Sequence, residues 1–124
     1  LFGLGTWLSE GDGTCRKAVQ LAIESGYRLI DTATMYENEA DVGAALKESG
    51  KASGSEIFIV SKLATTDHGR DAALAAIDRT LSALGVKQLQ LWLMHSPASG
   101  KVLEKLQKGG VIEAVGDTSC MFIQ

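Results

Sequence analysis

Short apolar runs alternate with longer amphipathic segments along this chain, and this alternation restricts its fold more than any other feature. Four of the apolar runs are predicted to be strands, and they lie at residues 1–5, 28–31, 57–62 and 89–95. The segments between them carry apolar side chains at helical spacing and are predicted to be helices, at residues 14–25, 38–49 and 71–84. Because strands that alternate with helices form βα units, the chain is predicted to be an α/β protein with a parallel sheet.

Each predicted helix has end signals and one apolar face. Thr14 and Asn38 are predicted to cap the first two helices at their amino ends. Gly26, Gly50 and Gly85 follow the three helices and are predicted to end them. The residues predicted to face the core are Ala18, Leu21, Ala22 and Ser25 in the first helix, Val42, Ala45, Leu46 and Ser49 in the second, and Ala73, Ile77, Leu81 and Leu84 in the third.

The pattern continues beyond the fourth run. Residues 101–108 are predicted to form a short fourth helix, and residues 111–115 a fifth strand. Pro97 directly follows the fourth run, where it suits the exit from a strand into a loop. Since no linker or low-complexity tract interrupts the chain, residues 1–124 are predicted to form a single domain with about five strands.

The composition is that of a soluble globular protein, with 45% hydrophobic and 22% charged residues. No apolar run approaches the roughly 20 residues that span a bilayer, so we expect a cytoplasmic protein without membrane partners. The net charge of -3 offers no general basic field for nucleic acid. The two cysteines, Cys15 and Cys120, are expected to be free thiols, and two unequally placed histidines make a metal site unexpected.

Four polar residues stand at or just beyond the ends of the predicted strands. Asp31, Lys62 and His95 each close an apolar run, and Tyr36 lies in the turn that follows Asp31. Barrel enzymes carry their chemistry at the carboxyl ends of parallel strands and in the loops behind them. We therefore predict that the four side chains share one catalytic site.

Several motifs together resemble the aldo-keto reductases. They are Gly-Leu-Gly-Thr-Trp at residues 3–7, the segment from Gly26 to Glu39 followed by Val42 and Gly43, residues 57–63, residues 81–85 and residues 91–97. The resemblance covers nearly the whole chain. It implies a parallel (β/α)8 barrel of the TIM type, and an enzyme that uses NADPH to reduce aldehydes and ketones to alcohols or runs the reverse oxidation.

The chemistry of the four residues agrees with that reaction. Carbonyl reduction needs a proton on oxygen, and Tyr36 is the one member of the set whose neutral side chain can donate it without first being charged. A lysine ammonium beside the phenol favours the phenolate, and an aspartate holds that lysine in place, which suits Lys62 and Asp31. His95 would orient the carbonyl oxygen of a small-molecule substrate. By resemblance, this is the catalytic tetrad of the family.

Taken alone, each of these residues has a simpler interpretation. Asp31 could form an Asx turn, Tyr36 could be a half-buried loop aromatic and His95 a structural hydrogen-bond donor. Lys62 at a strand end could also form a Schiff base in a barrel aldolase, which is the strongest rival enzyme on spacing alone. The order of the four residues in the chain and the residues that flank them favour the catalytic tetrad over these separate interpretations.

The resemblance also implies contacts for other residues. Gly5 and Thr6 are predicted to lie near the nicotinamide, with Trp7 as an aromatic wall of the substrate pocket beside Tyr36 and His95, although Trp7 could equally fill the core. Thr118 and Ser119 stand where the family holds the carboxamide. Next to them, Asp117 replaces an apolar residue of the family pattern and Cys120 an aromatic one, and elsewhere Gln90 replaces an acidic residue.

The chain is shorter than a complete (β/α)8 barrel, which takes roughly 250 residues. We therefore expect about half of a barrel, without the later loops that usually bind phosphate in such barrels. An incomplete barrel would expose sheet edges and helix faces, so we expect self-association through those edges and a marginal monomer. The alternative function is a catalytically inactive half-barrel that serves as an interaction or regulatory module, or a decayed gene product.

Overall fold

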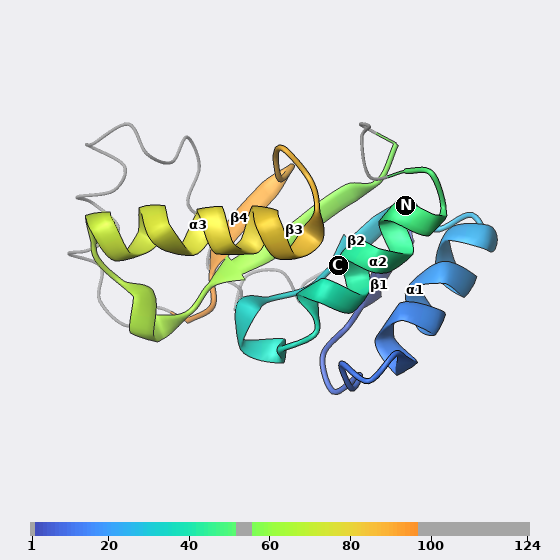
Figure 1. Cartoon of the computed structure of the whole chain (residues 1–124), viewed down its shortest axis with the longest axis horizontal. Helices are drawn as coiled ribbons and strands as arrows, with labels where there is room; N and C mark the ends of the chain where they lie inside the picture. The colour runs from blue at the N-terminus through green and yellow to red at the C-terminus, as the bar shows by residue number, and fades with distance from the viewer. Residues whose placement is uncertain (1, 52–55, 97–124) are drawn as a thin grey trace.

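The described residues form a parallel sheet in which the strands follow one another in chain order. The computed structural model describes residues 2–51 and 56–96. The strands are β1 (Gly3–Gly5), β2 (Leu29–Asp31), β3 (Phe58–Leu63) and β4 (Leu91–Met94), and they lie in the order β1-β2-β3-β4 (Figure 1). Each neighbouring pair is parallel, as the alternation of strands and helices predicts.

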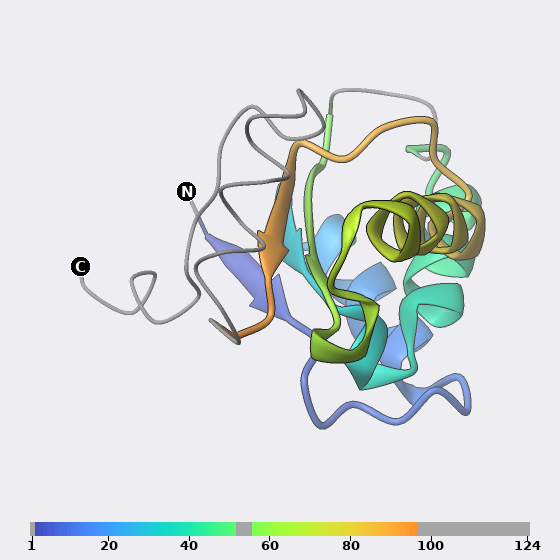
Figure 2. The ribbon, with the colours of Figure 1, turned by 90° about the vertical axis from the view of Figure 1, so that its left-hand side faces the viewer.

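The described helices all cover the same face of this sheet. They are α1 (Thr14–Glu24), α2 (Glu39–Glu48) and α3 (Arg70–Leu84), with short 3-10 helices η1 (Thr34–Tyr36) and η2 (Thr65–Asp67) after β2 and β3. Figure 2 shows α1, α2 and α3 together on one side of the strands. No helix within the described ranges is long and apolar enough to cross a membrane. The predicted helix at 101–108 and the predicted strand at 111–115 lie outside the described residues.

The hydrophobic core lies between the helices and the sheet. Side chains alternate along a strand, so Ile59, Ser61 and Leu63 of β3 point to the helices whereas Lys62 points to the other face. Leu63 packs on a small cluster of α3 alanines. The main cluster contains Cys15, Val19 and Ile23 from α1, Ile30 and Ile59 from the sheet, Val42, Ala45 and Leu46 from α2, and Ile57 and Leu84.

The predicted faces of two helices need correction. In α1 the buried residues are Cys15, Val19, Ala22 and Ile23, whereas Leu21 is 62% exposed. The apolar residues of α1 form two overlapping stripes, and contact with the sheet selects the one that contains Val19. In α3, Ile77 and Leu81 are only half-buried, because the smaller Ala76 and Thr80 occupy the line closest to the sheet. The face predicted for α2 is confirmed except at its last residue, Ser49, which is half-buried.

The ends of the helices also differ from the prediction at one point. The N-cap of α1 is Gly13, with a φ of +99°, and not Thr14. Asp41 of α2 accepts hydrogen bonds from the backbone N–H groups of Gly13 (2.9 Å) and Arg16 (3.4 Å), so the neighbouring helix supplies the cap. The glycines predicted to follow the helices all have positive φ angles, which confirms them: Gly26, Gly50 and Gly85.

Helices α2 and α3 approach one another without intervening side chains at Gly43. A Cβ atom at this position would lie 2.5 Å from the carbonyl oxygen of Ala83 and 2.8 Å from that of Leu84. Only glycine fits this contact, because both opposing atoms belong to the backbone.

Gln90 extends the pairing of β3 with β4 by one hydrogen bond from a side chain. The ladder begins at the pair Val60 and Leu91, and Gln90 Oε1 accepts the backbone N–H of the preceding β3 residue, Ile59, at 2.8 Å. A carboxylate at this position would offer the same kind of acceptor.

We expect Gln90→Leu to lower the free energy of unfolding by about 1–3 kcal/mol, because the buried N–H of Ile59 would lose its acceptor. Gln90→Glu keeps an acceptor oxygen and is the matched control. Urea unfolding of the two variants measures the difference, and equal stability of both would show that the hydrogen bond contributes nothing.

Candidate active site

The structure brings all four predicted catalytic residues together at the carboxyl end of the sheet. Lys62 Nζ lies 2.6 Å from Asp31 Oδ1 and 3.1 Å from the phenol oxygen of Tyr36. It also donates to the backbone carbonyl oxygen of Thr32, at 3.0 Å. The aromatic rings of Tyr36 and His95 meet edge to face, with their centroids 5.5 Å apart and an interplanar angle of 83°. The site is thus a connected group of side chains from three strand ends and one turn.

The strands determine these positions. Asp31 is the last residue of β2, Lys62 is the last but one of β3, and His95 directly follows β4. The backbone N–H of His95 donates to Leu63 O at 3.0 Å, which continues the ladder past the end of β4. Tyr36 is the last residue of η1, and η1 ends at Glu37 with a left-handed φ of +56°. This tight turn brings the phenol back over the sheet.

Lys62 is a buried cation whose contacts balance its charge. The residue is only 5% exposed, and its three acceptors match the three N–H donors of an ammonium group. A buried ammonium without such partners would be very costly, since it loses its hydration. The carboxylate of Asp31 is more open to solvent, with 27% of its side chain exposed. The ion pair therefore fixes Lys62 while leaving Asp31 partly accessible.

The surroundings of His95 favour its neutral form. Burial lowers the pKa of His95 below its ordinary value, the positive charge of Lys62 lowers it further, and the carboxylate of Asp31 acts in the opposite direction. A neutral imidazole carries one N–H donor and one acceptor nitrogen. At neutral pH, His95 can thus donate a hydrogen bond but has little tendency to carry a second proton.

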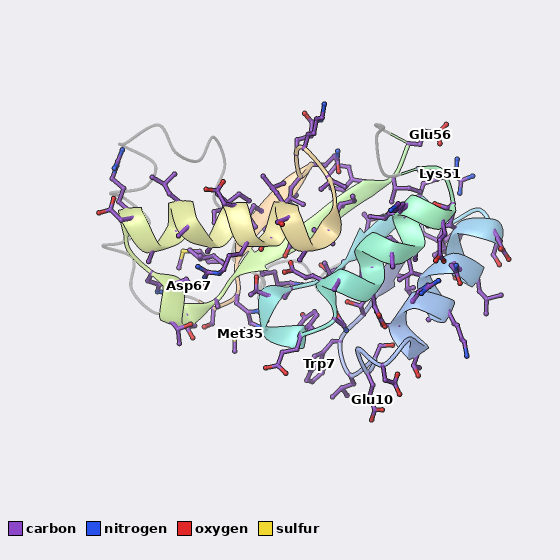
Figure 3. All side chains as sticks on the ribbon, viewed as in Figure 1. Trp7, Glu10, Met35, Lys51, Glu56 and Asp67 are labelled. Atoms are coloured by element: carbon purple, nitrogen blue, oxygen red, sulfur yellow. The ribbon has the colours of Figure 1, made fainter. Side chains whose placement is uncertain are left out.

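The side chain of Trp7 is not core filling. It is 69% exposed, and it lies at the same end of the molecule as Met35 and Asp67, opposite Lys51 and Glu56 (Figure 3). Met35, which sequence reasoning did not select, is also exposed and directly precedes Tyr36.

Of the residues predicted to touch a cofactor, Gly5 and Thr6 have different surroundings. Gly5 ends β1, and an added Cβ there would meet no atom of the described residues within 4 Å. Thr6 is 2% exposed, and its hydroxyl lies 3.2 Å from Asp31 O and 3.3 Å from Asn38 Oδ1. The hydroxyl of Thr6 is therefore engaged within the protein. Thr118 and Ser119 lie outside the described residues.

Asn38 connects the loop after β1 to the loop after β2. It stands at the N-cap position of α2, as predicted, but its side chain makes no capping hydrogen bond. Instead, Nδ2 donates to the carbonyl oxygens of Thr6 and Ser9, both at 2.8 Å, and Oδ1 accepts from the hydroxyl of Thr32 at 3.2 Å. Sequence reasoning selected Asn38 as a helix cap. An amide at the start of a helix indicates a cap. It does not indicate hydrogen bonds to Thr6 and Ser9, which lie far from Asn38 in the chain.

Neither a metal site nor a reactive cysteine is supported by the described residues. Residues 2–51 and 56–96 contain no group of three His, Cys, Asp or Glu side chains that could hold a metal ion. Cys15 is a free, fully buried thiol, and burial raises its pKa. This environment disfavours the reactive thiolate.

Comparison with known proteins places these features in context. A model of the aldo/keto reductase family matches residues 2–120 of this chain. The chain is similar to glyoxal reductase of Bacillus subtilis, with 43% identity over 121 residues that cover 93% of this chain and 44% of that protein. It is also similar to morphine 6-dehydrogenase of Pseudomonas putida, with 38% identity over 130 residues that cover 98% of this chain and 43% of that protein. The chain spans less than half the length of these curated relatives.

Solved structures give the same picture of the fold. The chain is similar to an aldo/keto reductase from Brucella melitensis, with a TM-score of 0.75 and 36% identity over 92% of this chain and 47% of that one. It is also similar to a Bombyx mori aldo-keto reductase in complex with NADP, with a TM-score of 0.74 and 29% identity over 92% of this chain and 45% of that one. These neighbours are (β/α)8 barrels, and the chain covers about half of each, which confirms the predicted barrel type.

We expect Asn38→Asp to lower the free energy of unfolding by about 2–4 kcal/mol at neutral pH. The change replaces a donor by a carboxylate oxygen that would face the carbonyl oxygens of Thr6 and Ser9. Gln88→Glu makes the same chemical change at an exposed position, and we expect it to stay within about 0.5 kcal/mol of the parent. Urea unfolding compares them, and an Asn38→Asp protein as stable as the parent would contradict the proposed hydrogen bonds.

The ionisation of His95 provides a test of the site's electrostatics. We expect its ring to titrate below about 6.5 and Lys62→Met to raise its pKa, because the variant removes the positive charge that disfavours imidazolium. An NMR titration of the histidine ring protons measures both, with His68→Gln to assign the two signals. An unchanged or lower midpoint in Lys62→Met would contradict the arrangement.

Proposed function

Because this chain belongs to the aldo/keto reductase family, we propose that it supplies the acid–base site of an enzyme that reduces aldehydes or ketones to alcohols with NADPH. The observation that carries this proposal is the contact between Lys62 Nζ and the phenol oxygen of Tyr36, at 3.1 Å, with Lys62 ion-paired to Asp31. A half-buried phenol beside a fixed cation is suited to proton transfer at a developing oxyanion.

Tyr36 is proposed to be the proton donor. NADPH, when bound, supplies the hydride for the carbonyl carbon. The carbonyl oxygen gains negative charge as this happens, and the hydroxyl of Tyr36 gives its proton to that oxygen. The ammonium of Lys62 stabilises the phenolate that remains, since it already donates a hydrogen bond to the same atom. In the reverse oxidation the phenolate would accept the proton back.

Lys62 and Asp31 have different electrostatic roles: Lys62 acts on the phenol of Tyr36, and Asp31 stabilises the charge of Lys62. Lys62 is buried and would be destabilised without a counter-charge, which Asp31 provides at 2.6 Å. Asp31 therefore acts on Tyr36 only through Lys62. This order of contacts also speaks against the aldolase alternative, because a Schiff base requires a free amine and all three donors of Lys62 are already engaged.

His95 is proposed to orient the substrate. Its ring meets that of Tyr36 edge to face, so a carbonyl oxygen in reach of the phenol would also be near the imidazole. Because burial and Lys62 favour the neutral ring, His95 would donate a hydrogen bond rather than transfer a proton. Trp7 is proposed to line the approach to this point, with most of its ring exposed.

The residues at the carboxyl end of the sheet have the chemistry that a hydride-transferring cofactor requires. A hydride transfer leaves an oxygen that needs both a proton and positive charge, and Tyr36 and Lys62 offer these side by side. No atom of the described residues lies within 4 Å of the point that a Cβ of Gly5 would occupy, and Asp31 is partly exposed, so both are proposed to lie beside the nicotinamide. Thr118 and Ser119 stay as predicted contacts to the carboxamide. Thr6 would shape the loop after β1, because its hydroxyl is engaged by its neighbours.

The substrate is proposed only as a class, a small carbonyl compound. Two of the relatives are named after different molecules, glyoxal for one and morphine for the other. These substrates differ too much in size and shape for either to be assigned to this chain.

We expect Tyr36→Phe to lower the rate of NADPH-dependent aldehyde reduction by at least about 100-fold, because the variant removes the proton donor. NADPH binding should be unchanged. Loss of absorbance at 340 nm measures turnover, and NADPH fluorescence measures binding. Tyr27→Phe is the matched control, since it removes the other tyrosine of the chain and should retain the parent's activity.

The outcomes separate the alternatives. Unchanged turnover in Tyr36→Phe would remove Tyr36 from its assigned role. If the parent chain binds no NADPH up to millimolar concentration, the chain does not form a working cofactor site by itself, which favours the non-catalytic half-barrel. Borohydride trapping of a carbonyl substrate on Lys62 would instead support the aldolase.

A further inference from the structure

Glu39 is a buried acidic residue that the proposed chemistry does not use. It is the first residue of α2 and is only 6% exposed. Its Oε1 atom accepts a hydrogen bond from the hydroxyl of Ser61 at 2.6 Å, and its Oε2 atom lies 3.5 Å from the hydroxyl of Thr80. The carboxyl group thus lies between α2, β3 and α3, on the helix side of the sheet.

Ser61 links Glu39 to Lys62. Ser61 and Lys62 are consecutive residues of β3, and each is buried. Their side chains lie on opposite faces of the strand, that of Ser61 toward the helices and that of Lys62 toward the catalytic residues. A hydrogen bond of 2.6 Å to Ser61 therefore restrains the strand directly behind Lys62. The position of the ammonium depends on this stretch of backbone.

A second connection leads from Glu39 toward Tyr36. The hydroxyl of Thr80, near Glu39 Oε2, also forms a hydrogen bond of 3.1 Å with the hydroxyl of Thr34. Thr34 is the first residue of η1, the three-residue helix that ends at Tyr36. Glu39 is thereby joined to both elements whose side chains meet at the Lys62–Tyr36 contact.

Burial of a carboxyl at this point opposes stability. Burial raises the pKa of Glu39, while the hydroxyls of Ser61, Thr80 and Thr34 act in the opposite direction. An apolar residue would avoid this cost of desolvation. A carboxyl group, however, offers two acceptor oxygens that can hold Ser61 and Thr80 at the same time.

We propose that Glu39 is a positioning residue, which fixes the Lys62–Tyr36 contact from behind the sheet by holding Ser61 on one side and Thr80 with Thr34 on the other. The inference rests on the proposed function in that the Lys62–Tyr36 contact is taken as the one that serves catalysis. Glu39 touches neither of the two side chains. It acts through the backbone that carries them.

The test follows the phenol of Tyr36 by NMR and needs no turnover. The chain has only two tyrosines, so in a Tyr27→Phe background a protein labelled with ¹³Cζ-tyrosine gives one signal, from Tyr36. The shift of this carbon reports the hydrogen bonding of the phenol oxygen. Lys62→Met removes the donor and gives the reference position for a lost contact.

We expect Glu39→Leu to move the signal most of the way toward the Lys62→Met position. Glu39→Gln should leave it near the parent position, because the amide keeps an acceptor for Ser61 and can donate to Thr80. Val42→Ala, a core truncation in the same helix, is the control for a general loss of stability and should not move the signal. Ser61→Ala serves if Glu39→Leu does not fold, and it should move the signal in the same direction.

The other possible results distinguish failure of the inference about Glu39 from failure of the proposed function. If Lys62→Met moves the signal but Glu39→Leu and Ser61→Ala do not, Glu39 is not a positioning residue, and the proposed function is unaffected. If Val42→Ala moves the signal as far as Glu39→Leu, the effect is one of general stability, and the inference is equally refuted. If Lys62→Met itself has no effect, the Lys62–Tyr36 contact is absent in solution, and the basis of the proposed function fails with it.

Discussion

The described structure is arranged around the burial of one positive charge, the ammonium of Lys62. This group is nearly removed from water, so its hydration must be replaced by protein acceptors. The acceptors come from the end of β2, from the residue that follows it and from the last residue of η1. Satisfying Lys62 therefore fixes the distance between β2 and β3 at their carboxyl ends and holds the phenol of Tyr36 above them. Stability and the arrangement of the site have the same origin.

Two consecutive residues at the start of α2 support this arrangement from different sides. Asn38 reaches toward the loop after β1 and joins it to Thr32, whereas Glu39 reaches toward β3 and α3. Both are buried polar residues with their hydrogen-bonding groups engaged, which makes the start of α2 a junction between the loops that carry the site and the helices behind the sheet.

Sequence reasoning succeeded where the contacts follow from strand order and failed where they depend on packing. The convergence of Asp31, Lys62 and His95 was predictable, because residues at the ends of neighbouring parallel strands must meet at one edge. The capping of α1 by Asp41 was not, since no local pattern shows that a carboxylate of another helix will reach Gly13. The buried face of α1 was wrong for the same reason: the sheet, and not the periodicity of the helix, selects Val19 over Leu21. The roles of the four residues and the contacts of Thr118 and Ser119 stay predictions.

The order of the strands has a consequence for how such a chain is made. Within the described residues, each new strand pairs with the strand that precedes it in the chain, and each helix that separates two strands returns to the same face of the sheet. During synthesis, a new βα unit can thus dock onto a finished one as soon as it leaves the ribosome, without waiting for distant segments. Asp31 and Tyr36 emerge early, the partner Lys62 arrives with the third strand, and His95 comes last. The site would therefore be assembled in the order of translation, beginning with the carboxylate of Asp31 and ending with the imidazole of His95.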